Sequence, residues 1–144
     1  MNIKEIIELF QGKYGVKNFR QIKNNYWRCE ILTKEERSQL IHIYYKEIRR
    51  DKTDESRIII ETPIGPLHKD LNYENILRKN SQLEVGTFCI EDLRNEGNMV
   101  IPYLTLRATH LVHTADKEEV FELAEKVANK ADELEKEIFA RDLH

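Results

Sequence analysis

The sequence predicts an α+β fold: a five-stranded antiparallel sheet in the element order α-β-β-β-α-β-β-α, with the helices mainly on one face. Two observations lead to this prediction. Short runs in which apolar and polar residues alternate are separated by turn residues, which is typical of hairpin-connected strands. Both ends of the chain instead carry apolar residues at intervals of three and four, the period of a helix. A chain of 144 residues is expected to form one domain, residues 1–144.

The first ten residues predict an amphipathic helix. Its apolar side chains recur at i, i+3, i+4 and i+7, and so share one face: Ile3, Ile6, Ile7 and Phe10. Asn2 can cap the start of this helix, and Gly12 ends the pattern. A helix this short needs a larger surface to pack against.

Three strands are expected next, at residues 26–32, 39–45 and 57–62. In the first, Trp27, Cys29 and Ile31 point to one face while the residues between them point to the other. A charged segment, residues 49–55, is expected to be a loop between the second and third strands. Pro63 is expected to end the third strand.

The second half predicts a short helix, two strands and a long helix. The short helix spans residues 71–80, with Asp70 or Asn72 as its cap, and the strands span residues 85–91 and 99–109. Pro102 cannot donate to a ladder, so the last strand should lie at an edge or be bulged there. Residues 117–141 form the strongest helix pattern, preceded by Asp116 as its cap.

Composition excludes several classes of function. The net charge is −3 and the two signs are intermixed, so no basic stripe predicts a nucleic-acid partner. No apolar run approaches the roughly 20 residues that span a bilayer, and the first residues read as a helix rather than a signal peptide. We therefore expect a soluble protein of the cytoplasm. Two cysteines, Cys29 and Cys89, are too few for a disulfide framework and are expected to be buried reduced thiols.

No catalytic residue, metal ligand set or cofactor motif is predicted. Cys29 and Cys89 lack local basic surroundings that favour a thiolate, and no glycine-rich phosphate loop is present. His110 and His113 are three apart, which places them on opposite faces of a strand, so joint metal ligation would need a loop there. The chain is therefore expected not to be an enzyme. An alternative is a small-molecule-binding protein or enzyme with a polar pocket that joins residues such as His42, Glu61 and His110.

A protein-binding face is the remaining possibility. If the helices cover the sheet face that carries Trp27, the opposite face is left open. The residues expected there as partner-binding candidates are Tyr26, Leu40, Tyr44 and Tyr103. Tyrosines combine an apolar ring with a polar tip, which protein interfaces favour. The alternative is that these residues are ordinary cross-strand pairs that stabilise the sheet.

Three segments carry a resemblance to a known family. Residues 75–90 (NILRKNSQLEVGTFCI) look like a helix that ends in an Arg-x-Asn segment and a glycine that starts the next strand. Residues 62–65 look like a proline-containing strand end, and residues 113–120 like the approach to a final helix. In these passages and in element order, the chain resembles the bacterial type III secretion chaperones and their stand-alone relatives.

The resemblance implies a non-enzymatic homodimer joined through the middle helix and the neighbouring strand. Carried over by position, the dimer candidates are Ile76, Leu77, Phe88 and Ile90, although the same residues are equally suited to the core of one copy. The expected partners are therefore a second copy and an unidentified protein client. Family chaperones hold extended client segments against apolar patches, partly by strand addition.

Overall fold

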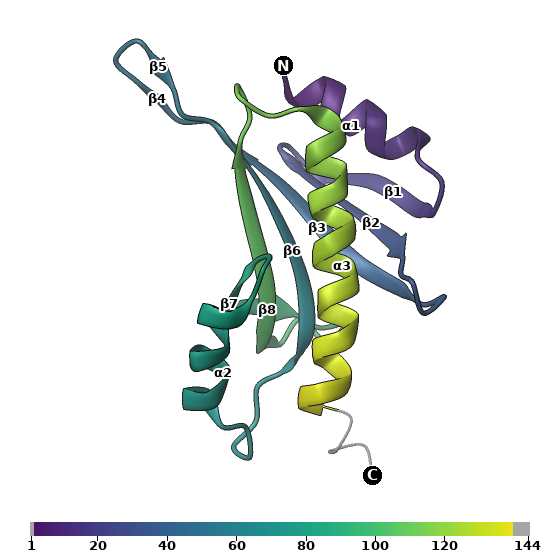
Figure 1. Cartoon of the computed structure of the whole chain (residues 1–144), viewed down its shortest axis with the longest axis vertical. Helices are drawn as coiled ribbons and strands as arrows, with labels where there is room; N and C mark the ends of the chain where they lie inside the picture. Colours follow the sequence, from purple (N-terminus) through teal and green to yellow (C-terminus); the bar gives the residue numbers. More distant parts are fainter. Residues whose placement is uncertain (1, 140–144) are drawn as a thin grey trace.

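The computed structural model describes residues 2–139 (Figure 1). The helices are α1 (Ile3–Gly12), α2 (Tyr73–Lys79) and α3 (Lys117–Phe139), and a short 3-10 turn, Asn80–Gln82, follows α2. The strands are β1 (Val16–Lys23), β2 (Tyr26–Leu32), β3 (Ser38–Lys46), β4 (Arg49–Arg50), β5 (Thr53–Asp54), β6 (Arg57–Pro66), β7 (Thr87–Arg94) and β8 (Val100–Leu111).

One six-stranded antiparallel sheet forms the body of the protein. Its strand order is β1-β2-β3-β6-β8-β7, so β1 and β7 are the two edges. Strands β4 and β5 pair only with each other and form a ribbon that projects away from the body (Figure 1). The predicted α+β class and antiparallel pairing are confirmed. The predicted count of five strands and the predicted element order need correction, since β1 and the ribbon were not expected.

The unexpected strand β1 carries no alternating pattern. Its apolar residues Val16, Phe19 and Ile22 are three apart, and its pairing with β2 is interrupted by two register shifts. Asn18, at the first shift, has a φ of 52°. A bulge adds a residue to one strand and so shifts later side chains to the other face. The period of two that identifies a strand is therefore hidden in this part of the sequence.

Two prolines lie inside the sheet. Strand β6 continues through Pro63 to Pro66, past the predicted end, with a register shift after Pro63. Strand β8 is an interior strand whose pairing with β7 is regular at Pro102, so the prediction of an edge or bulge there is wrong. The Pro102 carbonyl accepts a hydrogen bond from the Leu67 N–H, 3.0 Å away and just beyond the end of β6. In a strand the N–H and C=O of one residue point to the same side, so the nitrogen of Pro102 also faces the side of Leu67. Strand β6 has already ended there, so the ladder does not need an N–H at this position.

The three helices and one face of the sheet share a buried core. The apolar stripe of α3 is buried at Val120, Ala124, Val127, Ala131 and Leu134, while Leu123 and Ile138 are partly buried against the same core. Sheet residues of the same core include Ile31, Ile41, Ile43, Ile58, Ile60 and Leu106. Complete burial of one such side chain contributes roughly 1.5–3 kcal/mol. Figure 1 shows α3 crossing the sheet, with the N-terminal helix α1 beside its first turns.

Helix starts agree with the predicted caps. The Asn2 side chain accepts from the Glu5 N–H at 3.0 Å, and Asn72 accepts from the Asn75 N–H at 3.1 Å. Asp116 likewise accepts from the Glu118 N–H at 2.8 Å. Each cap satisfies an N–H that the helix itself leaves unpaired. The predicted end of the last helix, residue 141, lies outside the described residues.

Candidate interaction face

The register of the sheet divides its side chains into two faces. Residues directly opposite each other in antiparallel strands share a face, so the core residues mark the face that the helices cover. The opposite face, here called the open face, carries Tyr26, Arg28, Glu30, Leu40, His42, Tyr44, Ile59, Glu61, Tyr103, Thr105, Arg107, Thr109, Thr87, Cys89 and Glu91. The buried helix residues share one core with the side chains of the covered face.

Tyr26 is the centre of a hydrogen-bonded group on the open face. Its hydroxyl oxygen lies 2.6 Å from Nδ1 of His42 and accepts a bond from Nη2 of Arg28 at 3.2 Å. The Tyr26 hydroxyl and Nδ1 of His42 share this hydrogen bond, and which of them donates is set by the imidazole tautomer. The Arg28 guanidinium also lies over the Tyr26 ring, 6.0 Å from its centroid.

Burial keeps His42 neutral. Its side chain is only 5% exposed, and burial together with the charge of Arg28 lowers the pKa of His42 to about 4. No hydrogen-bond partner for Nε2 occurs within residues 2–139. His42 is consequently an uncharged imidazole beside the tyrosines at neutral pH.

Tyr26 and Tyr44 form the predicted aromatic pair. They are cross-strand partners whose rings stack with centroids 4.5 Å apart, and the His42 ring lies 6.3 Å from that of Tyr44. Burial, followed by the neighbouring Tyr26, raises the pKa of Tyr44. Tyr44 therefore presents a neutral phenol at physiological pH.

Glu61 and Arg107 form an ion pair across β6 and β8. Nε of Arg107 lies 3.2 Å from Oε1 of Glu61, although the two groups are not aligned for a hydrogen bond. Glu61 is 6% exposed, and burial, followed by the charge of Glu91, raises its pKa to about 7, against the opposing effect of Arg107. Glu61 and Glu91 thus place two carboxyls in one partly buried group.

The four predicted partner-binding residues all lie on the open face, but in separate places. Tyr26 and Tyr44 are in contact, and Leu40 precedes Tyr44 on the same strand, β3. Tyr103 is opposite Glu91 in the β7–β8 pair, on the far side of β6. The structure therefore brings together Tyr26 and Tyr44 but not Tyr103.

The four predicted dimer residues divide into two kinds. Ile76 and Phe88 are 6% and 5% exposed and belong to the core, so they offer little surface to a second copy. Leu77 and Ile90 are 63% and 58% exposed. Tyr73 is 40% exposed and lies one helical turn before Leu77 on α2.

The alternative polar pocket does not assemble as expected. His42 and Glu61 are cross-strand partners on the open face, whereas His110 is opposite Ile58 and shares the covered face. Arg107 takes the place expected of His110 beside Glu61. Within the described part of the chain, no group of three or more His, Cys, Asp or Glu side chains is arranged to hold a metal ion.

The two thiols lie on opposite faces of the sheet. Cys29 is buried in the core, where burial raises its pKa to about 12. Cys89 is on the open face and only partly buried, which corrects the expectation that both are buried, and burial raises its pKa too. Neither thiol has the depressed pKa of a catalytic nucleophile.

Sequence reasoning named Glu61 as a pocket candidate but missed the contacts that Arg28 and Arg107 make on the open face. Arg28 and Arg107 occupy polar positions of otherwise apolar strands, which is the one signal that could have identified them. The partner of Arg107 is Glu61 of β6, so the pattern within β8 does not reveal the ion pair that the two form.

Comparisons with known proteins leave the family of this chain undetermined. A scan against protein-family models finds no match, and a search of curated proteins finds none either. No helix in residues 2–139 is both long enough and apolar enough to cross a membrane. The likeness to the secretion chaperones therefore depends on the sequence passages alone, since the element order on which it also drew needs correction.

Proposed function

We propose that this chain is a non-enzymatic, chaperone-like protein-binding module that acts in the cytoplasm as a homodimer. The open face carries the proposal, because it presents the stacked Tyr26 and Tyr44 rings and the side chain of Leu40 without a helix packed over them. Tyrosine and leucine side chains together suit an extended client segment that has apolar residues between polar ones.

The edges of the sheet offer a second means of holding such a segment. Strands β1 and β7 each have a strand neighbour on one side only. A client strand can therefore add its main-chain hydrogen bonds to either edge, while its side chains reach the open face. This mode needs no cofactor and no covalent chemistry.

The homodimer would use the surface of α2 and β7. Leu77 and Ile90 expose most of their apolar side chains there, and Tyr73 exposes two-fifths of its own. Exposed apolar side chains on neighbouring elements favour burial against a second copy of the same surface. This proposal retains only the exposed pair among the four residues that the resemblance suggested.

Suppression of aggregation tests the proposed function. Insulin whose disulfides have been reduced aggregates, and its light scattering should fall in proportion to the amount of this protein added. Tyr26→Ser combined with Tyr44→Ser should abolish most of that effect, whereas Tyr14→Ser should not, because Tyr14 is 94% exposed in the turn between α1 and β1. Circular dichroism checks that the variants remain folded. Full suppression by the folded double variant would contradict the proposal.

A further inference from the structure

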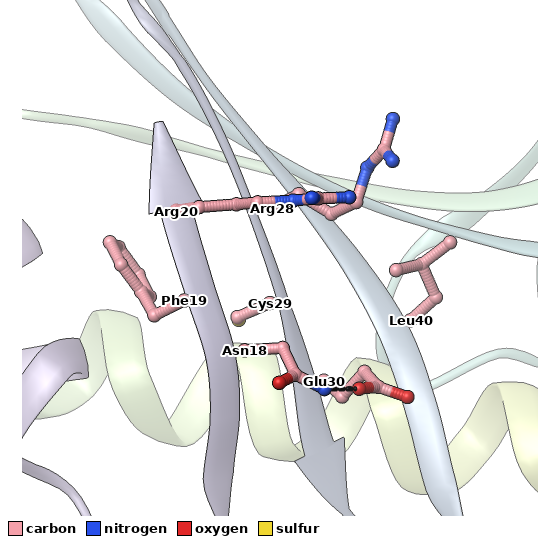
Figure 2. A pocket seen from close by; sticks show the side chains of 7 residues that line it. All are labelled: Asn18, Phe19, Arg20, Arg28, Cys29, Glu30 and Leu40. Atoms are coloured by element: carbon pink, nitrogen blue, oxygen red, sulfur yellow. Dashed lines mark hydrogen bonds between the residues drawn. The ribbon is translucent and has the colours of Figure 1, made fainter. Parts of the chain in front are cut away.

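A hollow of about 480 Å³ lies at the β1 end of the sheet (Figure 2). It forms where two residues of β1, Asn18 and Phe19, bulge opposite the single residue Cys29 of β2. Its lining also includes Arg20, Arg28, Glu30 and Leu40. The volume falls in the range of small-molecule sites, about 300–1,000 Å³.

Two arginines of this hollow lack a carboxylate partner. Arg20 and Arg28 are directly opposite each other in the β1–β2 pair, an arrangement of like charges that destabilises a sheet. Neither forms an ion pair with a carboxylate of residues 2–139, and the buried Nε of Arg28 has no hydrogen-bond partner there. In Figure 2 the Arg20 side chain extends from β1 across β2 towards Arg28.

Arg28 is held in position by Tyr26, a neighbour that is not part of the lining of the hollow. Its Nη2 donates to the Tyr26 hydroxyl, and its guanidinium lies over the Tyr26 ring. Such support reduces the freedom that an arginine loses on binding an anion. Arg28 is therefore partly preorganised, whereas Arg20 is exposed and adjustable.

The one carboxylate of the lining is already engaged. Glu30 accepts a hydrogen bond from the side-chain amide of Asn18, on the side of the hollow away from the arginines (Figure 2). The lining thus carries two positive charges and one negative charge. Its net charge favours an anion, and guanidinium groups bind carboxylate and phosphate oxygens in a bidentate manner.

We propose that this hollow binds a small organic anion through a single oxyanion group, a phosphate monoester or a carboxylate. Arg20 and Arg28 hold the oxygens, and the apolar part of the ligand lies against Leu40. This activity goes beyond the proposed client binding and does not depend on it, because it needs neither a client nor a second copy.

Titration of the full chain by NMR tests the proposal. The probes are phenyl phosphate and benzoate, with inorganic phosphate and phenol as their separate parts. Phenyl phosphate, benzoate or both should shift the Arg28 Nε–H signal and the amides of residues 18–20 and 28–30. A response to phenyl phosphate alone identifies a phosphate site, and a response to benzoate alone a carboxylate site. No response to either at about 10 mM, or an equal response to phenol, overturns the proposal.

Three variants separate a site from general charge attraction. Arg20→Gln should weaken binding about tenfold, since one charge-assisted contact is lost. Lys23→Gln is the matched control, because Lys23 is an exposed cation of the same strand that does not line the hollow. Glu30→Gln keeps an oxygen for Asn18 and should tighten binding. Equal weakening by Arg20→Gln and Lys23→Gln, or weaker binding by Glu30→Gln, contradicts the site.

Discussion

His42 and Glu61 lie directly opposite each other in β3 and β6, and the same cause moves their pKa values in opposite directions. Burial lowers the pKa of His42 to about 4 and raises that of Glu61 to about 7, because it disfavours the charged form of each group. Both groups are therefore predominantly uncharged between about pH 4 and pH 7. Their contributions to stability therefore change with pH in opposite directions over most of that range.

The first prediction concerns this pair. The unfolded His42 has a pKa of 6.5, so its contribution is present above pH 6.5 and is lost as the pH falls towards 4. The unfolded Glu61 has a pKa of 4.5, so its contribution is present below pH 4.5 and is lost as the pH rises through 7. Each amounts to about 3 kcal/mol at most, and the two offset each other between pH 4.5 and 6.5.

Urea unfolding at a series of pH values checks this compensation. As the pH falls from 7 to 4.5, His42→Gln should become more stable relative to the original protein, and Glu61→Gln less stable. Carboxylates elsewhere in the chain titrate alike in all three proteins, so the differences isolate the pair. Parallel profiles for the three proteins would show that neither pKa is displaced on folding.

The second prediction concerns the Tyr26 hydroxyl. Tyr26→Phe leaves the buried Nδ1 of His42 without its partner, so the free energy of unfolding should fall by about 1–3 kcal/mol. Tyr14→Phe removes the same hydroxyl from a side chain that is 94% exposed, and should change stability by less than about 0.5 kcal/mol. Urea unfolding of both variants gives the comparison. Equal stabilities would mean that the Tyr26–His42 bond contributes nothing.

The third prediction concerns Gly86, which has a φ of +78°. A Cβ atom there would lie 2.9 Å from the Leu106 side chain and 3.3 Å from the Arg107 carbonyl oxygen. Gly86→Ala should therefore lower stability by about 1–3 kcal/mol. Gly12→Ala, where a Cβ meets nothing within 4 Å, should be neutral or slightly stabilising. Thermal unfolding gives the midpoint temperature of each variant. An equal change in that midpoint for both variants would argue against the packing described around β7.

The fourth prediction concerns the proposed homodimer. Static light scattering at micromolar concentration should give twice the chain mass of 17.2 kDa. Leu77→Ser combined with Ile90→Ser should give a monomer that remains folded, because both side chains are exposed in one copy. Met99→Ser, at an exposed site in the β7–β8 turn, is the control and should leave the dimer intact. A monomeric original protein would remove the dimer from the account.

Elements with a regular period were predictable from the sequence. The α3 stripe repeats at steps of four and three, and β2 alternates at every position, so the start of α3, the bounds of β2 and the inward faces of both follow from local pattern. Strand β1 was not predictable in this way, because its bulges place apolar residues three apart. The interior position of Pro102 was equally hidden, since it depends on where β6 ends.

The open face was predictable only in part. Alternation placed Tyr26 and Tyr44 on the same side of their strands, and the structure stacks their rings. The Glu61–Arg107 pair depends instead on β6 lying next to β8, which are separated by α2 and β7 in the chain. Such distant pairing leaves no trace in the pattern of either strand, so it could not be read from one sequence.

The open face as a client surface is tested most directly by locating a bound client. An isotope-labelled sample can be titrated with a reduced, carboxymethylated protein that stays unfolded, and the amide signals followed by NMR. The account predicts that signals around Tyr26, Leu40 and Tyr44 shift or broaden while those of the solvent side of α3 do not. Signals that remain unchanged, or that change on α3 alone, would contradict it.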